Sequence, residues 1–151
     1  MQTFKRNNPG NIRYNPSNKW QGQIGEQGGF VIFDNADNGI RAMVRLLYNY
    51  KTQGIDSTQA IISRYAPGSE NNTASYIRTV SNKIGKQPSE TLQTANDYYN
   101  LIQSMIKVES GQDADAQTLS AISKYLQYPV VQEISVAALA IGAGVLIWIF
   151  M

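Results

Sequence analysis

The sequence has 151 residues, about the length of one domain, and its formal net charge of +2 is too small to indicate a nucleic-acid-binding surface. It contains no cysteine and no histidine. These absences exclude disulfides, thiol nucleophiles, Ser-His and Cys-His catalysis and most zinc sites. Any catalysis must therefore rest on carboxylates, Lys, Tyr or Ser, and we expect neither a metal site nor a cofactor.

Residues 6–42 are rich in Asn and Gly and carry several aromatic side chains: Tyr14, Trp20, Phe30 and Phe33. Because proline restricts φ and Asn and Gly tolerate positive φ, residues 8–11 (NPGN) predict a tight, well-defined turn. Residues 20–24 and 29–33 predict two strands of a small hairpin, with Glu26 at its tip. A rigid polar loop with aromatic side chains beside a helical scaffold suits a carbohydrate-binding cleft. A surface hairpin with core aromatics is the alternative.

The chain after residue 38 predicts amphipathic helices, because apolar residues recur at helical spacing between capping and stop signals. Gly54, Gly85 and Gly111 are the predicted stops. The predicted helices cover residues 39–53, 58–65, 73–84, a stretch from about 90 to 110, and a last one opened at Asp115, with caps at Asn38, Ser57, Asn72, Ser89 and Asp115.

The C-terminal residues 134–151 are apolar except for Ser135. As a helix this run would span about 27 Å, close to the roughly 30 Å hydrocarbon core of a bilayer. Trp148 would suit a membrane interface. The sequence therefore predicts a single membrane anchor over residues 130–151, and a buried core helix is the alternative. Residues 1–86 then form the main domain, and residues 87–129 form a helical spacer or second layer.

Several short motifs together resemble a known family. They are residues 7–13 (NNPGNIR), 20–22 (WQG), 29–34 (GFVIFD), 39–42 (GIRA), 65–67 (YAP), 70–73 (ENNT) and 76–77 (YI). In these residues the chain resembles phage-encoded lysozyme-like proteins, which include virion-associated peptidoglycan hydrolases and lytic transglycosylases. More distantly it is similar to the glucosaminidase branch of the lysozyme superfamily. The resemblance covers roughly residues 5–85.

The resemblance implies a mainly α (α+β lysozyme-like) fold, with a small β-hairpin lobe plus helices, followed here by the C-terminal transmembrane helix. It also implies a phage protein that cleaves the glycan strands of peptidoglycan. The anchor would place it in the internal membrane of a virion, where capsid or vertex proteins are further partners, or in the host inner membrane as a lysis protein.

Cleavage of a glycosidic bond needs a carboxylic acid that gives its proton to the leaving oxygen. Glu70 and Glu26 are the candidates within the resembling region. Glu70 precedes a predicted helix, so a structural role there is its alternative, and a solvated charge at the hairpin tip is the alternative for Glu26. The predicted substrate-binding residues are Trp20, Tyr14, Asn8, Asn11, Tyr65, Asn71 and Tyr76, although aromatic residues are equally often part of a core.

The chain departs from the family pattern in one respect. Longer members carry their principal catalytic Glu on a helix upstream of the Asn-Pro-Gly-Asn turn. Here six residues precede Asn7, and none of them is acidic. Two function classes follow: an enzyme whose acid comes from Glu70 or Glu26, or a non-catalytic virion membrane protein of the same fold that binds glycan or a capsid partner.

Overall fold

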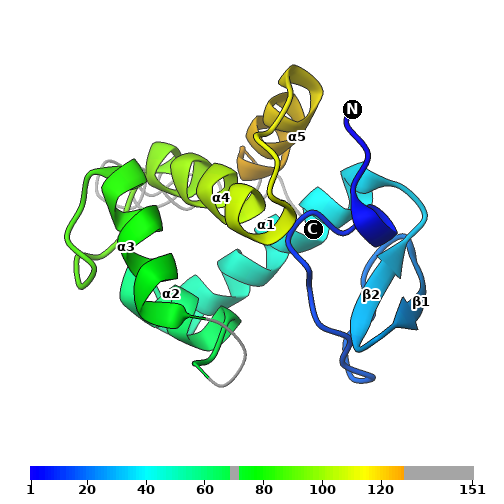
Figure 1. Cartoon of the computed structure of the whole chain (residues 1–151), viewed down its shortest axis with the longest axis horizontal. Helices are drawn as coiled ribbons and strands as arrows, with labels where there is room; N and C mark the ends of the chain where they lie inside the picture. Colours follow the sequence, from blue (N-terminus) through cyan, green and yellow to red (C-terminus); the bar gives the residue numbers. More distant parts are fainter. Residues whose placement is uncertain (69–71, 128–151) are drawn as a thin grey trace, which may run out of the picture.

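The hairpin lies at one end of the molecule and helices α2 and α3 lie at the other, with the long helix α1 running between them (Figure 1). The structure is a computed structural model that describes residues 1–68 and 72–127. Its elements are the 3-10 helix η1 (Lys5–Asn7), strands β1 (Gln23–Gln27) and β2 (Phe30–Phe33), and helices α1 (Ala36–Thr52), α2 (Thr58–Tyr65), α3 (Thr73–Ile84), α4 (Ala95–Ser110) and α5 (Ala116–Leu126).

Three of the predicted helix starts are confirmed. The side chains of Ser57, Asn72 and Asp115 each accept a hydrogen bond from the backbone N–H three residues further on. Such a cap satisfies one of the N–H groups that the first helical turn leaves without a partner. Local sequence chemistry is therefore sufficient to start α2, α3 and α5.

Two predicted helix starts are wrong. Helix α1 begins at Ala36, because Asn35 rather than Asn38 is its cap. Helix α4 begins at Ala95 behind a capping box made by Thr94 and Asp97, and not after Ser89. The segment between α3 and α4 is instead held against the start of α2, where Leu92 N–H donates to the Asp56 carbonyl at 2.7 Å. These tertiary bonds replace the helical bonds that the local pattern predicted.

The hairpin turns at Gly28 and Gly29, which have φ values of 61° and 83°. A two-residue turn with positive φ at both positions matches the twist of antiparallel strands and favours glycine. Glu26 therefore lies within β1, opposite Val31, rather than at the turn. The pairing is irregular between Gln23 and Gly25, so β1 carries an extra residue there.

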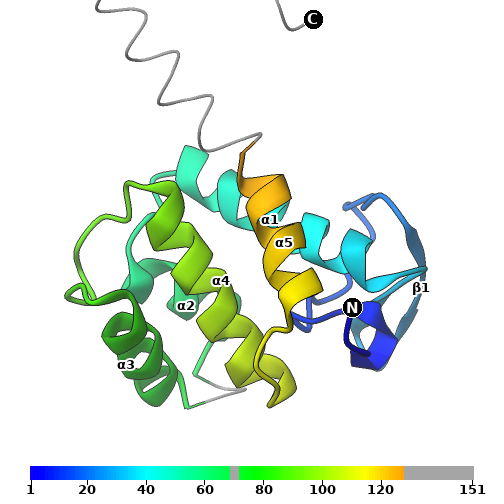
Figure 2. The same cartoon turned by 90° about the horizontal axis from the view of Figure 1, so that it is seen from above.

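Helix α4 lies between α3 and α5 and packs against both of them (Figure 2). The apolar faces of strand β2 and of helices α1 to α5 meet in one core. Elements before and after the predicted boundary at residue 86 both supply it, through fully buried side chains that include Phe33, Ile40, Met43, Leu47, Ile61, Ile62, Leu101, Ile102, Met105 and Ile122.

The predicted fold class needs correction. The described residues form an α+β fold of five α-helices and one two-stranded sheet, not a mainly α protein that continues into a transmembrane helix. The helices have between 8 and 17 residues and are amphipathic. Within residues 1–68 and 72–127, none is both long and apolar enough to span a bilayer. The predicted anchor, residues 130–151, lies outside the described residues.

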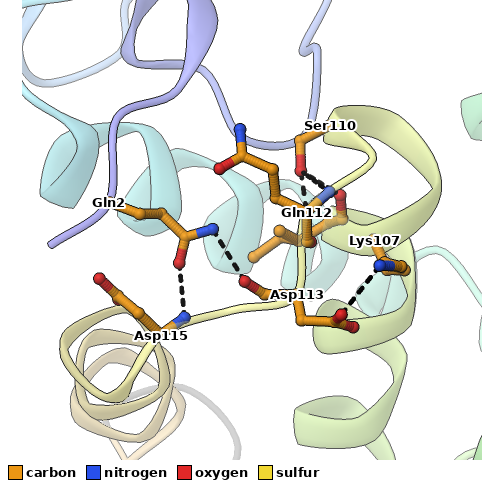
Figure 3. A network of polar contacts seen from close by, with 7 residues as sticks. Gln2, Lys107, Ser110, Gln112, Asp113 and Asp115 are labelled. Atoms are coloured by element: carbon orange, nitrogen blue, oxygen red, sulfur yellow. Dashed lines mark hydrogen bonds and ion pairs between the residues drawn. The ribbon is translucent and has the colours of Figure 1, made fainter.

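The chain start is tied to the loop between α4 and α5 (Figure 3). The Gln2 side chain donates to the Asp113 carbonyl at 2.9 Å and accepts a hydrogen bond from the Asp115 N–H. Lys107, on the last turns of α4, pairs with the Asp113 carboxylate at 2.8 Å. These contacts place the N-terminal segment against the C-terminal end of α4.

Gly39 lets α1 approach the Asn-rich turn closely. A Cβ atom at this position would lie 2.1 Å from the Asn7 carbonyl oxygen and 2.8 Å from Cδ of Pro9. We expect Gly39→Ala to lower the free energy of unfolding by about 2–3 kcal/mol, because backbone and a proline ring must move to admit the methyl group. Urea unfolding of the purified protein measures this change.

Gly25→Ala is the control for Gly39→Ala, since its Cβ would make only an ordinary 3.8 Å contact with Ile32. In an unobstructed helix, Gly→Ala stabilises by up to about 1 kcal/mol. A stabilised Gly39→Ala protein would therefore contradict the close approach of α1 to the turn.

Candidate functional site

The turn at residues 8–11 is held together by the buried side chain of Asn8. Its Nδ2 donates to the carbonyls of Ile12 and Val31, both at 3.0 Å, and its Oδ1 accepts from the Ile12 N–H at 2.8 Å. Both amide hydrogens are thus used inside the protein. Asn8 connects the turn to strand β2.

Three residues other than glycine around this turn have left-handed backbone conformations. The φ values are 59° for Arg6, 51° for Asn7 and 49° for Asn11. Asn adopts this region more easily than most residues, but for Arg it is uncommon. Asn7 is secured by its Nδ2, which donates to the Phe33 carbonyl at 3.0 Å. The turn is therefore a specified structure in which each backbone conformation is supported by a tertiary contact.

The turn brings Asn11 to Glu109, on the last turn of α4. Asn11 Nδ2 donates to the Glu109 carbonyl oxygen at 2.9 Å and to the carboxylate oxygen Oε2 at 3.2 Å. Arg6 Nη2 donates to Oδ1 of the same amide at 3.2 Å. The Glu109 carboxyl is half-buried at the junction of α4 with the N-terminal turn.

Two tyrosines complete this site, one from the end of α2 and one from α3. The Tyr65 hydroxyl donates to the Gly10 carbonyl. The Tyr76 hydroxyl is buried beside Glu109, and each of the two groups shifts the pKa of the other. The two groups do not form a hydrogen bond of regular geometry. The candidate site is therefore formed by Asn11, Tyr65, Tyr76, Glu109 and the neighbouring Arg13.

Burial raises the pKa of Glu109 above its ordinary value, because removal from water penalises the charged form. The hydrogen bond from Asn11, the nearby Tyr76 hydroxyl and the positive charge of Arg13 oppose this rise in pKa only partly. The position at the C-terminal end of α4 also disfavours a negative charge. Burial is the larger cause and the negative charge of Glu109 the next in raising the pKa of Tyr65 and of Tyr76. Both phenols therefore stay protonated.

Arg13 is positioned by a neighbouring aromatic ring. The centre of the Phe30 ring lies 4.9 Å from the Arg13 guanidinium carbon and 4.7 Å from that of Arg6. Attraction between a guanidinium and the face of a ring is worth roughly 0.5–1 kcal/mol at an exposed site. Phe30, at the start of β2, thereby places positive charge near Glu109.

Among the described residues, no cluster of acidic side chains is suited to hold a metal ion.

The predicted site residues are distributed over different parts of the structure. Asn11, Tyr65 and Tyr76 come together around Glu109, whereas Asn8 lies inside the turn. Tyr14 is 40% exposed on the hairpin side. Trp20 is half-buried against the core, and its indole N–H has no hydrogen-bond partner among the described residues.

Glu26, the predicted catalytic glutamate that the structure describes, does not lie at this junction. Glu26 is exposed in β1, and its carboxylate accepts a hydrogen bond from the Gly29 N–H at 3.1 Å. This bond supports the hairpin turn. Glu70, like the predicted substrate contact Asn71, lies outside the described residues, so the roles predicted for both stay predictions.

Sequence reasoning missed Glu109, although the sequence contains a signal for it. The apolar face of α4 runs through Tyr98, Leu101, Ile102, Met105 and Ile106, and position 109 continues the same face at the helical spacing of i+4 and i+7. A glutamate on the core-facing side of an amphipathic helix is either paired or functional. Its place in a predicted spacer helix concealed that signal.

The fold and the site together define a small α+β protein with one half-buried glutamate where a helix end meets an N-terminal turn. No protein-family model matches the sequence. The chain is 34% identical over 113 residues to Protein P5 of Pseudoalteromonas phage PM2, a match that covers 72% of this chain and 70% of that protein. The chain therefore belongs to the same family as this phage protein.

A raised pKa for Glu109 has a consequence for stability. A carboxyl whose pKa is higher in the folded state favours folding below the pKa of the unfolded chain, and this contribution is lost as the pH rises through the folded-state pKa. Glu109→Gln removes the titration and keeps the shape. We expect its urea midpoint relative to wild type to increase as the pH rises from the ordinary range for a glutamate through the raised pKa of folded Glu109.

Glu90→Gln is the matched control for this comparison, since Glu90 is exposed and only accepts a hydrogen bond from the Gln87 N–H in a turn. Urea titrations of the three proteins at several pH values measure the effect. A Glu109→Gln protein that becomes relatively less stable towards neutral pH would show that the site favours the charged carboxylate.

Proposed function

We propose that this protein is a phage virion protein that cleaves the glycan strands of peptidoglycan, with Glu109 as the general acid. The observation that carries the proposal is the half-buried Glu109 carboxyl, whose pKa is raised by burial between Asn11 and Tyr76. A glycosidic oxygen leaves only when it is protonated, and a carboxyl kept neutral by its surroundings is suited to protonate it. Membership in a family with a phage protein supports the phage context.

We propose a mechanism with one carboxyl group. Hydrolases use two, separated by about 5–5.5 Å or about 6.5–9.5 Å. Within the described part of the chain, the charged side chain that shifts the Glu109 pKa is Arg13, and no second carboxylate contributes. A lytic transglycosylase needs only one such group, because a hydroxyl of the substrate itself serves as the nucleophile.

The proposed reaction proceeds in two proton transfers. Glu109 gives its proton to the glycosidic oxygen as the bond between that oxygen and the anomeric carbon breaks, and the neighbouring Arg13 stabilises the carboxylate that remains. A hydroxyl of the same sugar then bonds to the anomeric carbon and returns its proton to Glu109. The strand is cut, no water is consumed, and the carboxyl regains its starting state.

The second candidate is a non-catalytic virion structural protein that binds glycan or a capsid partner. It is favoured by one observation: Asn11 already binds both the carbonyl and the carboxylate of Glu109, as a purely structural contact between the chain ends would require. In that case Glu109 would secure the N-terminal turn and would not transfer a proton.

Cleavage of purified peptidoglycan separates the two candidates. We expect Glu109→Gln to reduce the rate by about 100-fold or more, the usual contribution of a general acid, because the amide has no proton to transfer at that step. Soluble products separated by chromatography and identified by mass spectrometry measure the rate and show whether water was added. Glu90→Gln is the matched control, and we expect it to retain full activity.

The same assay tests the other acidic candidates. Loss of activity in Glu70→Gln with full activity in Glu109→Gln would assign the acid to Glu70, and the equivalent result for Glu26→Gln would assign it to Glu26. No cleavage by the wild-type protein at any pH would support the structural candidate.

The proposed role also predicts the pH dependence of cleavage. A general acid must be protonated, so activity should fall as the pH rises through the pKa of Glu109. Because this pKa is raised, the fall should begin above the ordinary range for a glutamate. Initial rates measured across pH, corrected for folded protein, test this expectation. An activity that increases through the same interval would instead indicate a base.

A further inference from the structure

The hydrogen bonds around Asn11 determine the orientation of its amide. Arg6 is only a donor, so the amide atom that faces it must be the oxygen, Oδ1. The amide nitrogen Nδ2 is thereby directed at Glu109, where it meets the carbonyl oxygen at 2.9 Å and Oε2 at 3.2 Å. In the opposite orientation, Nδ2 would face the Arg6 donor and Oδ1 would face the acceptor oxygens of Glu109.

The surroundings of Asn11 hold this amide in place. A Cβ atom at the preceding residue, Gly10, would lie 2.5 Å from the Tyr65 hydroxyl oxygen and 2.9 Å from the sulfur of Met43, so the turn is packed tightly against α2 and α1. The backbone of Asn11 is in the left-handed region, with φ of 49°. Arg6 is held in turn over the Phe30 ring.

We propose that Asn11, oriented by Arg6, is a positioning residue that fixes which oxygen of Glu109 carries the transferable proton. Nδ2 only donates, so Oε2 must act as an acceptor in both protonation states. The proton of the neutral carboxyl is therefore confined to Oε1. This inference rests on the proposed function, in which that proton passes to the glycosidic oxygen. It changes the role of Asn11 from a predicted substrate contact to a support for the acid.

The other groups that act on the Glu109 carboxyl do not replace this contact. Arg13 acts through its charge, and the Tyr76 hydroxyl stands beside the carboxyl from α3. Tyr65 interacts with Glu109 through charge and directs its own hydroxyl to the Gly10 carbonyl. Among the described residues, Asn11 is the one that forms hydrogen bonds of regular geometry with the Glu109 side chain.

Two substitutions of Asn11 test the proposal without straining the backbone. Asn11→Asp keeps the shape and the tolerance of a left-handed conformation, but it replaces the donor with a carboxylate. When two carboxylates share a site, the repulsion between their charges raises the pKa of one of them. Asn11→Gly removes the amide at a φ that glycine accepts freely. Asn82→Asp, on the exposed surface of α3, is the matched control for the added charge.

The primary measurement is the titration of Glu109 in the full chain, followed by the chemical shift of its carboxyl carbon in NMR. We expect Asn11→Asp to raise the Glu109 pKa by about one unit or more and to move the high-pH loss of cleavage in the same direction. We expect Asn11→Gly to lower kcat about 10-fold with little change in KM, because the acid is misoriented while binding surfaces remain. Asn82→Asp should leave all of these unchanged.

The outcomes separate this inference from the proposed function. If Glu109 titrates as in wild type in the Asn11→Asp protein, or moves towards the value of an unstructured glutamate, Asn11 does not position the carboxyl and the inference is overturned, even in an active enzyme. If the wild-type protein cleaves no glycan, the proposed function is overturned and the catalytic part of the inference with it. The NMR titration still decides whether Asn11 is coupled to Glu109.

Discussion

The buried amide of Asn8 is the contact on which the N-terminal half of the structure depends. It bonds the backbone of the turn at Ile12 and the backbone of strand β2 at Val31. A buried amide that lost these partners would cost about 1–3 kcal/mol for each unsatisfied group. The turn and the hairpin must therefore form together, because Ile12 and Val31 supply the backbone groups that satisfy Asn8.

The same turn joins the two ends of the described chain. Asn11 bonds Glu109, and Gln2 bonds the loop that follows α4, so residues 98 and 111 positions apart in the sequence lie side by side. Loop closure of this length has an entropic cost that grows only slowly with the number of residues. The polar contacts in Figure 3 and the shared apolar core together offset it.

Glu109 combines a cost in stability with the acid chemistry that we propose for it. Placing a carboxyl on the core-facing side of a helix, near its C-terminal end, penalises the charged form. Such a local conflict between residue type and position is expected at functional sites, where proton transfer benefits from an acid that does not ionise readily. Asn11 and Arg13 limit the penalty, through a hydrogen bond to the carboxylate and a nearby positive charge.

Elements with local signals could be predicted from the amino-acid sequence. The caps at Ser57, Asn72 and Asp115 and the helices behind them could be predicted because a side chain bonds a backbone group three residues away. The hairpin was also predicted, but with Glu26 at its tip rather than Gly28 and Gly29. The start of α4 could not be predicted in this way, since contacts with the segment before α2 hold residues 87–92 out of the helix.

The residues of the candidate site come together only when the chain has folded. Asn11, Tyr65 and Tyr76 were predicted as ligand contacts, but their common neighbour was unknown, because nothing local connects the turn to a helix 98 residues further along the chain. Glu70 and Glu26 were the predicted acids because they lie within residues 5–85, which carry the resemblance. Burial and hydrogen bonding to Asn11 give Glu109 its distinct environment, and both arise only when α4 packs against the turn.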